Sequence, residues 1–551
     1  MSATARKRLV ELQKNLYDQA LSDAQLYLQN SSPSLKRYAN EYQNNLPKSA
    51  KKTNRDHIIN TMHKHRYVLY GDFHTLRQNQ NGLLKLLKAY HKKFPNRPIT
   101  IAMESFKHID QEKINLYLKS MITDTDFLEQ VQWKEEWGYS WESYRPILEF
   151  AKKHYFKVVG INTPRGGKDE LDKRDHYASE VLLDIGSKYA NDLVVCMIGE
   201  LHLADKHLTG ILRKRCEDLQ IDNKVVRIVN NVDQYFFGKY AKHNLQRVNY
   251  LALKENFFSI QNAPPWIKWQ TYIISEELKS IDDEYDDPQD DEFDLYTEDT
   301  YDFDSHFLSL LNHIKKFLRL QIHHDILTKF CLVTFPDQET IDDLSGSWDI
   351  ERSEVARISK RIAIDGFHFV PKANLGIINN ISMNNLAYIT GQFLHNVLNK
   401  KIEAVSETDQ FFKRVLAHAA GMIATKILNP RRKGTDIWYF RRFLGSNKKQ
   451  NLQGHAQNLW MSAKAVIKIH EDLQRKYENN NKLTLPKSIV TEDNKLAYDI
   501  SRSYGQLLGH TLYSRVMGQS APADTMRLLF TFQENTSFQS QFSMIYRATN
   551  P

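Results

Sequence analysis

Five short apolar runs, each rich in Val or Ile, alternate with longer segments of helical periodicity between residues 56 and 277. This alternation is typical of βαβ units, in which helices cover both faces of a parallel sheet and the strands are apolar along their whole length. It predicts an α/β domain with a parallel sheet over 56–277. The runs are RYVLYG at 66–71, PITIAME at 98–104, FKVVGIN at 156–162, DLVVCMIG at 192–199 and KVVRIVN at 224–230.

An acidic segment separates this region from the rest of the chain. Residues 281–304 contain 13 Asp or Glu and no Lys or Arg. Such a run repels itself and is usually a solvated linker, although its five aromatic residues would also let it dock on a basic face. The length of 551 residues exceeds what one core normally holds. The predicted parts are an N-terminal helix and polar linker over 1–55, the α/β domain over 56–277, an acidic linker over 278–304 and a mostly α-helical C-terminal domain over 305–551.

The composition narrows the class of protein. Hydrophobic residues make up 41% and charged residues 26%, the balance of a soluble globular chain. No apolar run approaches the roughly 18 residues that a membrane span needs, and the charged opening segment lacks the apolar core of a secretory signal. The three cysteines are scattered, which argues against a disulfide framework. We therefore expect a cytoplasmic protein.

Polar residues follow four of the five apolar runs. In an open parallel sheet, ligands bind outside the carboxyl ends of the strands, so these residues are the first candidates for a site. The strongest signal is a pair of Gly-x-x-His turns that end at His74 and His202, with Glu104 at the end of an intervening run. The other strand-end candidates are Asp72, Asn162, Arg165, Glu200 and His207.

Two imidazoles and a carboxylate suit more than one chemistry. His74, Glu104 and His202 could bind a divalent metal that keeps one position open for water. Without a metal, the same residues could act as a carboxylate and histidine general base. In a purely structural alternative, the two histidines cap helices or fill polar niches.

An aromatic insert lies between the second and third runs. Trp137, Tyr139 and Tyr144 fall within it, among charged residues. Aromatic side chains beside a polar crevice predict a lid or the walls of a site for a flat ligand. The alternative is a satellite core beneath a helical hairpin.

Several motifs of this region resemble the ChaN family, which belongs to the superfamily of haem-binding uptake proteins, Tiki, TraB and erythromycin esterase. The resemblance covers about residues 60–275. It differs at Asp72, where ChaN chains typically have Glu, and at 78–80, where they often have a further histidine. The motifs are GDFH at 71–74, AMESF at 102–106, the W-x-x-Y-x-P-I-L-x-F-A pattern at 141–151, GINTPR at 160–165, RDHYA at 174–178, GELH at 199–202 and NAPPWIKWQ at 262–270.

The resemblance implies an α/β fold with its site at the strand ends and two competing roles. ChaN-like proteins are associated with haem or iron handling, whereas Tiki proteins and erythromycin esterase act as hydrolases that use the equivalents of His74, Glu104 and His202. The leading hypothesis is therefore a protein that holds haem, iron or a related metal complex. The alternatives are a metal-dependent or His/Glu-dependent hydrolase and a degenerate scaffold that acts as an interaction module. The sequence leaves open whether the protein forms a homo-oligomer.

The helical half contains a stretch in which basic and aromatic residues are mixed, at 431–449. This composition suits an anionic partner such as nucleic acid or a membrane surface. A plain connector between helices, or a dock for the acidic linker, would have a similar composition. The same half also contains two similar tetrapeptides, GQFL at 391–394 and GQLL at 505–508, a resemblance that is too short to indicate a repeat.

Overall fold

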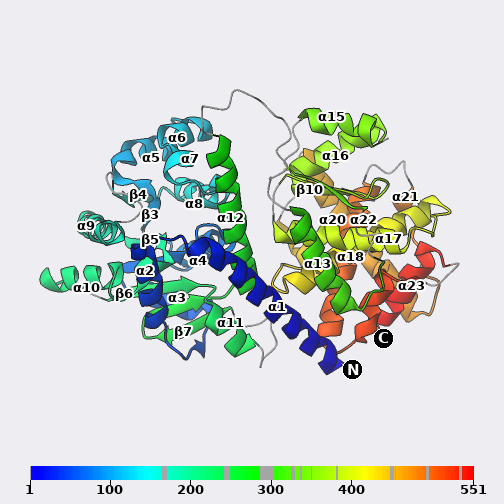
Figure 1. The fold of residues 1–551 in the computed structure, drawn as a ribbon, viewed down its shortest axis with the longest axis horizontal. Coiled ribbons are helices and arrows are strands. Elements are labelled where there is room, and N and C mark those ends of the chain that lie inside the picture. The colour runs from blue at the N-terminus through cyan, green and yellow to red at the C-terminus, as the bar shows by residue number, and fades with distance from the viewer. Residues whose placement is uncertain are drawn as a thin grey trace. The chain divides into compact units, whose positions relative to one another are not determined.

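The computed structural model divides the chain into two compact units. The α/β unit comprises Tyr17–Asp286, and the helical unit comprises Met1–Leu16 together with Asp287–Pro551 (Figure 1). The division at 286 lies within the acidic segment, and helix α12 (Pro265–Tyr285) reaches into that segment from the α/β side. The structure describes residues 2–163, 170–221, 224–240, 249–285, 303–323, 329–334, 338–348, 350–379, 382–446, 452, 454–491, 496–532 and 536–550.

An eight-stranded sheet forms the centre of the α/β unit, with the order β1-β7-β8-β6-β2-β5-β3-β4. Strands β2 to β6 are the five predicted runs and pair in parallel, which confirms the predicted fold class. Beyond them, β8 pairs in parallel with β6, and β7 is antiparallel to both β8 and β1. The strands are β1 (Lys51–Lys52), β2 (Tyr67–Asp72), β3 (Ile99–Lys107), β4 (Lys157–Asn162), β5 (Leu193–Gly199), β6 (Val225–Asn230), β7 (Tyr250–Lys254) and β8 (Phe257–Ile260).

Each face of this sheet packs against its own hydrophobic core. Along β5, Val195 and Met197 belong to one core, while Val194 and Cys196 belong to the other, as the two-residue period of a strand requires. Figure 1 shows α5, α6, α7 and α8 grouped beside the sheet. The first core includes α3 (Arg55–His63), α4 (Arg77–Lys93), α5 (Gln111–Leu118), α6 (Asp124–Gln130), α7 (Trp133–Glu136) and α8 (Trp141–Lys153). The second includes α2 (Pro33–Asn45), α9 (Leu171–Lys188), α10 (Leu208–Asp218) and α11 (Asp233–Tyr240).

Helix α2 replaces part of the expected polar linker. Its first turn contains Pro33, and the hydroxyl of Ser32 accepts a hydrogen bond from the backbone N–H of Leu35 at 3.2 Å. Proline suits this position because the first helical residues need no N–H donor within the helix. Tyr38 and Tyr42 are four residues apart, so they share one helix face, and both are buried. This face contributes to the site described below.

The helical unit is built around α18, most of whose side chains are buried. Its small residues let α17 and α22 approach closely: a Cβ added to Gly391 of α17 would lie 2.5 Å from the carbonyl oxygen of Ala420. The described helices are α13 (Phe303–Leu318), α15 (Gln338–Ser347), α16 (Arg352–Asp365), α17 (Met383–Leu398), α18 (Glu407–Leu428), α19 (Ile437–Ser446), α20 (Gly454–Glu478), α21 (Lys487–Val490), α22 (Ala497–Met517) and α23 (Phe538–Thr549). A three-stranded sheet of order β10-β11-β9, which the sequence did not predict, joins them: β9 (Cys331–Thr334), β10 (Phe367–Val370) and β11 (Leu375–Ile378).

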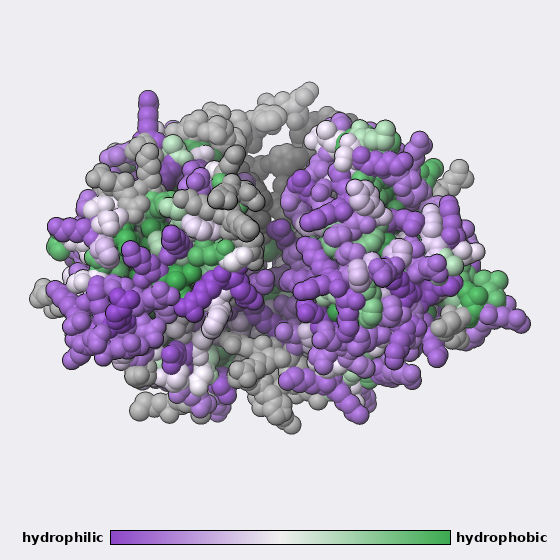
Figure 2. All heavy atoms as spheres, turned by 180° about the vertical axis from the view of Figure 1, so that it is seen from behind, coloured by the Kyte–Doolittle hydropathy of each residue, from purple (hydrophilic) through white to green (hydrophobic). Residues whose placement is uncertain are grey.

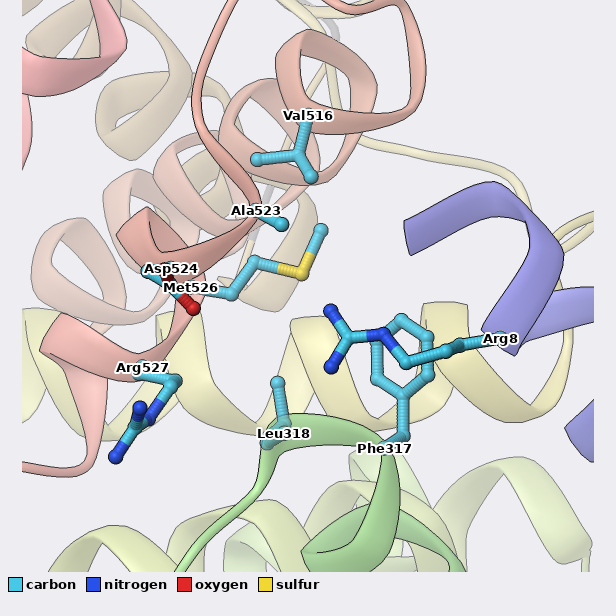
Figure 3. A pocket seen from close by; sticks show the side chains of 8 residues that line it. All are labelled: Arg8, Phe317, Leu318, Val516, Ala523, Asp524, Met526 and Arg527. Carbon is cyan, nitrogen blue, oxygen red and sulfur yellow. The ribbon is translucent and has the colours of Figure 1, made fainter. Parts of the chain in front are cut away.

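The start of α1 (Ser2–Leu28) packs within the helical unit. The guanidinium of Arg6 donates to the carbonyl oxygen of Met517 at 2.7 Å. Figure 3 shows the side chain of Arg8 beside the ring of Phe317, at the edge of a cavity of about 10 Å³. A cavity of this size holds about one water molecule, so it is too small for an organic ligand. Its lining residues are Arg8, Phe317, Leu318, Val516, Ala523, Asp524, Met526 and Arg527.

Hydrophilic side chains cover most of the face shown in Figure 2, with hydrophobic ones in smaller groups among them. Across the described residues, no helix is both long enough and apolar enough to span a membrane.

Candidate functional site at the strand ends

The carboxyl ends of β2, β5 and β3 bring the three leading candidates together. These strands are neighbours in the sheet, and Asp72 at the end of β2 is level with Gly199 at the end of β5. A Cβ added to Gly199 would lie 3.4 Å from Nε2 of His74 and 3.5 Å from Oε2 of Glu104. It would also lie 3.4 Å from Cδ2 of His202. The predicted convergence of these side chains on one sheet edge therefore exists.

His74 is held in place by a buried carboxylate. Its Nδ1 lies 2.9 Å from Oδ2 of Asp72, whose side chain is 2% exposed, whereas that of His74 is 23% exposed. The hydroxyl of Tyr144 donates to the same carboxylate oxygen at 2.8 Å, and Nε2 of Gln80 donates to the other at 2.7 Å. When Nδ1–H donates to a carboxylate, the neutral ring presents Nε2 as a lone-pair donor. His74 is therefore oriented as a ligand or a base.

Two aromatic rings of the insert flank His74. The ring centroid of Trp137 lies 4.6 Å from that of His74, and the centroid of Tyr139 lies 5.0 Å away. Other rings of the insert pack into the core, where Trp133, for example, is buried and contacts Tyr144. The insert therefore packs into the core, as the alternative predicts, and it also places two rings beside His74.

Glu104 is a buried, ionised carboxylate whose two oxygens already have partners. The guanidinium of Arg174 donates to Oε1, and the backbone N–H of Gly199 donates to Oε2 at 2.7 Å. Burial alone would raise the pKa of Glu104, but the charges of Arg174, His202 and His74 outweigh it and lower the pKa to about 2. A carboxylate with so low a pKa is a poor general base near neutral pH.

His202 forms a second pair with a buried carboxylate. Its Nδ1 lies 2.6 Å from Oδ1 of Asp175, and its Nε2 lies 3.7 Å from Oε1 of Glu104. The hydroxyl of Tyr38, from helix α2, lies 2.8 Å from the other oxygen of Asp175. Burial would lower the pKa of His202, but Asp175 and Glu104 outweigh it and raise that pKa above its usual value. Two Asp–His pairs therefore flank Glu104.

The expected metal set of His74, Glu104 and His202 stays a prediction. Within the described ranges, no group of three or more His, Cys, Asp or Glu side chains is arranged so that it could hold a metal ion. The reason at this site is that Arg174 and the N–H of Gly199 occupy the oxygens of Glu104, the carboxylate that was expected to bind the metal.

The other candidates have different surroundings. Glu200 lies in a separate buried cluster, where its carboxylate is 2.9 Å from Nζ of Lys268 and 3.3 Å from the hydroxyl of Tyr42. The side chain of Asn162 accepts a hydrogen bond from the backbone N–H of Thr163 at 3.0 Å. Arg165 lies outside the described residues.

His207 stacks on Tyr38 behind the second Asp–His pair. The two ring centroids are 3.6 Å apart, and Nε2 of His207 lies 3.0 Å from Glu41. Its Nδ1 is 4.0 Å from Asp175, and burial lowers its pKa. His207 is therefore nearest to Oδ2 of Asp175, whereas His202 contacts Oδ1.

Sequence reasoning did not assign roles to Arg174, Asp175 and Tyr38. Arg174 and Asp175 lie in the first turns of α9, away from any strand end, and appeared only within the RDHYA motif of the resemblance. Tyr38 lay in the presumed linker. The motif was the one signal that could have identified the first two.

Comparison with known proteins gives a family match for one segment of the α/β unit. Residues 58–180 match the model of the family described as haem-binding uptake, Tiki superfamily, ChaN. This confirms the family resemblance for the segment that contains His74, Glu104 and Asp175; His202 lies beyond the matched segment. The solved structure described as cofacial heme binding to ChaN of Campylobacter jejuni is similar, with 14% identity and a TM-score of 0.27. The similarity covers 33% of this chain and 88% of that chain. None of the curated proteins matches.

Proposed function

We propose that the α/β unit binds haem, or a related iron complex, at the carboxyl ends of β2, β5 and β3. The observation that carries the proposal is the setting of His74, whose ring is fixed by Asp72 and flanked by Trp137 and Tyr139. The family whose model matches this segment is described as haem-binding.

Accessibility selects His74 from the three converging side chains. Its side chain is 23% exposed, whereas those of Glu104 and His202 are each 6% exposed. A large flat ligand can therefore reach His74 without displacing the buried Arg174–Glu104 pair. The carboxylate of Asp72 accepts Nδ1–H, so Nε2 is the free ring nitrogen, in the tautomer that a metal-binding histidine needs.

The side chains of His74, Trp137 and Tyr139 have the chemistry that haem binding requires. Haem iron commonly takes an imidazole nitrogen as an axial ligand, and aromatic rings provide flat apolar contacts for a porphyrin. Bound haem would supply an iron centre; the protein would supply the oriented imidazole, the aromatic contacts and the Asp72 support. The ionised Glu104 and the Asp175–His202 pair would lie behind this position as a fixed polar layer.

A haemin titration followed by absorption tests the proposal. The wild type should give a saturable, shifted Soret band, and His74→Ala should weaken binding at least tenfold. His57→Ala is a matched control because His57 is an exposed histidine on α3; it should bind as the wild type does. Equal titrations of the wild type and His74→Ala would contradict the proposal, as would the lack of a saturable band in the wild type.

Hydrolysis is the second candidate, and the convergence of two Asp–His pairs beside Glu104 favours it. Histidine oriented by a carboxylate is a common general base, and His202 and His74 both have this arrangement. Ester and peptide substrates would test it: activity should fall by 10²-fold or more in His202→Ala, in line with the usual contribution of a general base. A wild type without turnover would rule this candidate out.

A further inference from the structure

Polar side chains gather inside the helical unit, where α17 and α22 flank α18. The two similar tetrapeptides meet here. Gly391 of α17 lies against the carbonyl of Ala420, and Gly505 of α22 lies against the carbonyl of Val415. Because each glycine lets its helix approach α18 closely, the glutamine that follows it, Gln392 or Gln506, reaches the same polar cluster.

A chain of hydrogen bonds joins the two glutamines. Nε2 of Gln506 donates to the hydroxyl of Tyr388 at 3.5 Å, and this hydroxyl lies 3.1 Å from Nδ1 of His418. Nε2 of Gln392 lies 3.2 Å from the same nitrogen. Burial and the charge of Arg502 hold the pKa of His418 well below its usual value, so the ring is neutral. Its Nδ1 is the acceptor, because the amide nitrogen of Gln392 can only donate. The hydrogen-bonded chain from Gln506 to Gln392 is therefore uncharged.

Positive charge around the cluster exceeds the negative charge that offsets it. Arg502 pairs with Asp365 at 2.7 Å, and Arg361 pairs with Asp499 at 2.5 Å, so each carboxylate already has its own arginine. Arg432 lies with its guanidinium 5.4 Å from the centroid of the Tyr388 ring. In the part of the chain that the structure describes, no acidic side chain lies within 4.0 Å of Arg432; its guanidinium donates only weakly, to the carbonyl of Asn384 at 3.4 Å.

Lys426, at the end of α18, adds a further buried cation. Its Nζ contacts the backbone carbonyls of Pro430 and Arg432, which fixes the loop that carries Arg432. Burial, reinforced by the nearby Arg432, lowers the pKa of Lys426 to about 8. Burial also lowers the pKa of Arg432 to about 10, because the nearby Tyr388 offsets little of the cost of desolvation. Lys426 is buried and Arg432 is partly buried. A cation that loses water without gaining a counter-charge is costly, and a bound anion would offset that cost.

The basic stretch at 431–449 therefore has two parts, which lie in different surroundings. Arg432 lies at the Tyr388 cluster, whereas Trp438 and Tyr439 on α19 are 64% and 47% exposed. Arg441 contacts the Trp438 ring at 5.3 Å and pairs with Glu471 at 3.1 Å. Of these two arginines, Arg441 has a carboxylate partner, whereas Arg432 at the Tyr388 cluster has none among the described residues.

We propose that this cluster binds the oxyanion of a small molecule, a phosphate monoester or a carboxylate, between α17, α22 and the loop that carries Arg432. Arg432 would supply the charge, because Arg502 is already paired with Asp365 and because a guanidinium group matches phosphate and carboxylate oxygens with paired N–H donors. Gln506 and Tyr388 would supply neutral hydrogen bonds. This site is separate from the strand-end site and does not depend on the haem proposal.

Thermal unfolding and calorimetric titration of the full chain at low salt test this site. The probes are inorganic phosphate, glycerol 3-phosphate and acetate, with chloride as the reference anion. Binding to the folded state raises the unfolding temperature in proportion to ln(1 + [L]/Kd). Phosphate probes should raise it more than acetate if the ligand is a phosphate ester, and less if it is a carboxylate. Equal effects of all four anions on the wild type would overturn the proposal.

Two arginine variants locate the binding. Arg432→Gln should weaken the binding of the preferred anion at least tenfold, whereas Arg441→Gln, on the exposed α19 face, should leave it within twofold. If Arg432→Gln does not fold, Arg432→Lys is the second variant. It keeps the positive charge but loses the paired N–H donors of the guanidinium group, so it should bind the anion three- to tenfold more weakly than the wild type. If Arg441→Gln loses binding while the Arg432 variant binds fully, the proposal is wrong. The site would then lie on the exposed α19 surface, where a polyanionic partner is expected to bind.

Discussion

Nδ1 of His202 lies 2.6 Å from Oδ1 of Asp175, a carboxylate with no exposed surface. The two residues come from different elements, the turn after β5 and the start of α9, and Tyr38 of α2 contacts the other oxygen of Asp175. Three segments far apart in the sequence thus fix one imidazole beside Glu104.

Removal of the charge of Asp175 should weaken both the fold and the orientation of His202. A hydrogen bond to a buried charged group contributes about 1.5–3 kcal/mol, so we expect Asp175→Asn to lower the free energy of unfolding of the α/β unit by about 2 kcal/mol. It should also lower the pKa of His202, which Asp175 raises. Urea unfolding and NMR titration of the imidazole measure these effects.

Asp172→Asn is the control, since that side chain is 62% exposed and its ion pair should contribute less than about 1 kcal/mol. An unchanged His202 pKa in Asp175→Asn would contradict the pairing.

Glu104 should stabilise the α/β unit in a pH-dependent way. Its pKa is about 2 in the folded protein against 4.5 as the ordinary value, so the folded state favours the ionised form. The stabilisation is therefore complete above about pH 4.5 and is lost as the pH falls towards 2. Glu104→Gln should be less stable than the wild type at pH 7 by about 3 kcal/mol, because Arg174 loses its buried partner. The difference should shrink between pH 4.5 and pH 3, as measured by urea unfolding. A difference that stays constant over this range would show that the charge of Glu104 is not its source.

Close packing of α17 on α18 should make Gly391 intolerant of a side chain. A Cβ at Gly391 would lie 2.5 Å from the carbonyl oxygen of Ala420, a backbone atom that cannot easily move. We expect Gly391→Ala to destabilise the helical unit by about 1–3 kcal/mol. Gly445→Ala on α19 is the control, because a Cβ there meets no atom within 4 Å; this change should be neutral or slightly stabilising. Thermal unfolding of both variants measures the contrast, and equal stabilities would argue against the close approach.

The acidic segment 278–304 should be the first site of limited proteolysis. The division between the two compact units falls at 286, and most of this segment lies outside the described residues. A protease that cuts after acidic residues should cleave this segment first and give two fragments, one of which begins near residue 303. Mass spectrometry of the early products identifies the cuts. Prompt cleavage elsewhere, with 278–304 protected, would contradict the domain division proposed from the sequence.

The apolar runs predicted the sheet because strands that are buried on both faces, such as β2 to β6, are apolar along their whole length. The short strands β1 and β7 have no such apolar run. Strand β1 is the pair Lys51–Lys52, and its pairing with β7 depends on the tertiary structure. Helix α2 was missed because its sequence is mostly polar, and the burial of Tyr38 and Tyr42 depends on the α/β unit against which they pack.

The candidate site was predictable where it follows strand ends and not elsewhere. His74, Glu104 and His202 follow from topology, because parallel strands place their carboxyl ends at one edge. Glu200 was misplaced because the 3₁₀ turn Glu200–Leu203 directs it to Lys268, whereas His202, two residues later, meets Asp175. Arg174 and Asp175 come from a helix, and only the folded chain shows that they complete the pairs with Glu104 and His202.

The most direct test of the central proposal is chemical rescue of His74→Ala by imidazole during a haemin titration. If Nε2 of His74 faces the ligand, the variant should lose the shifted Soret band, and free imidazole should restore it by occupying the space beside Asp72, Trp137 and Tyr139. His57→Ala should keep the band without imidazole. A variant that keeps the wild-type band, or a lost band that imidazole does not restore although the protein is folded, would contradict the assignment of His74.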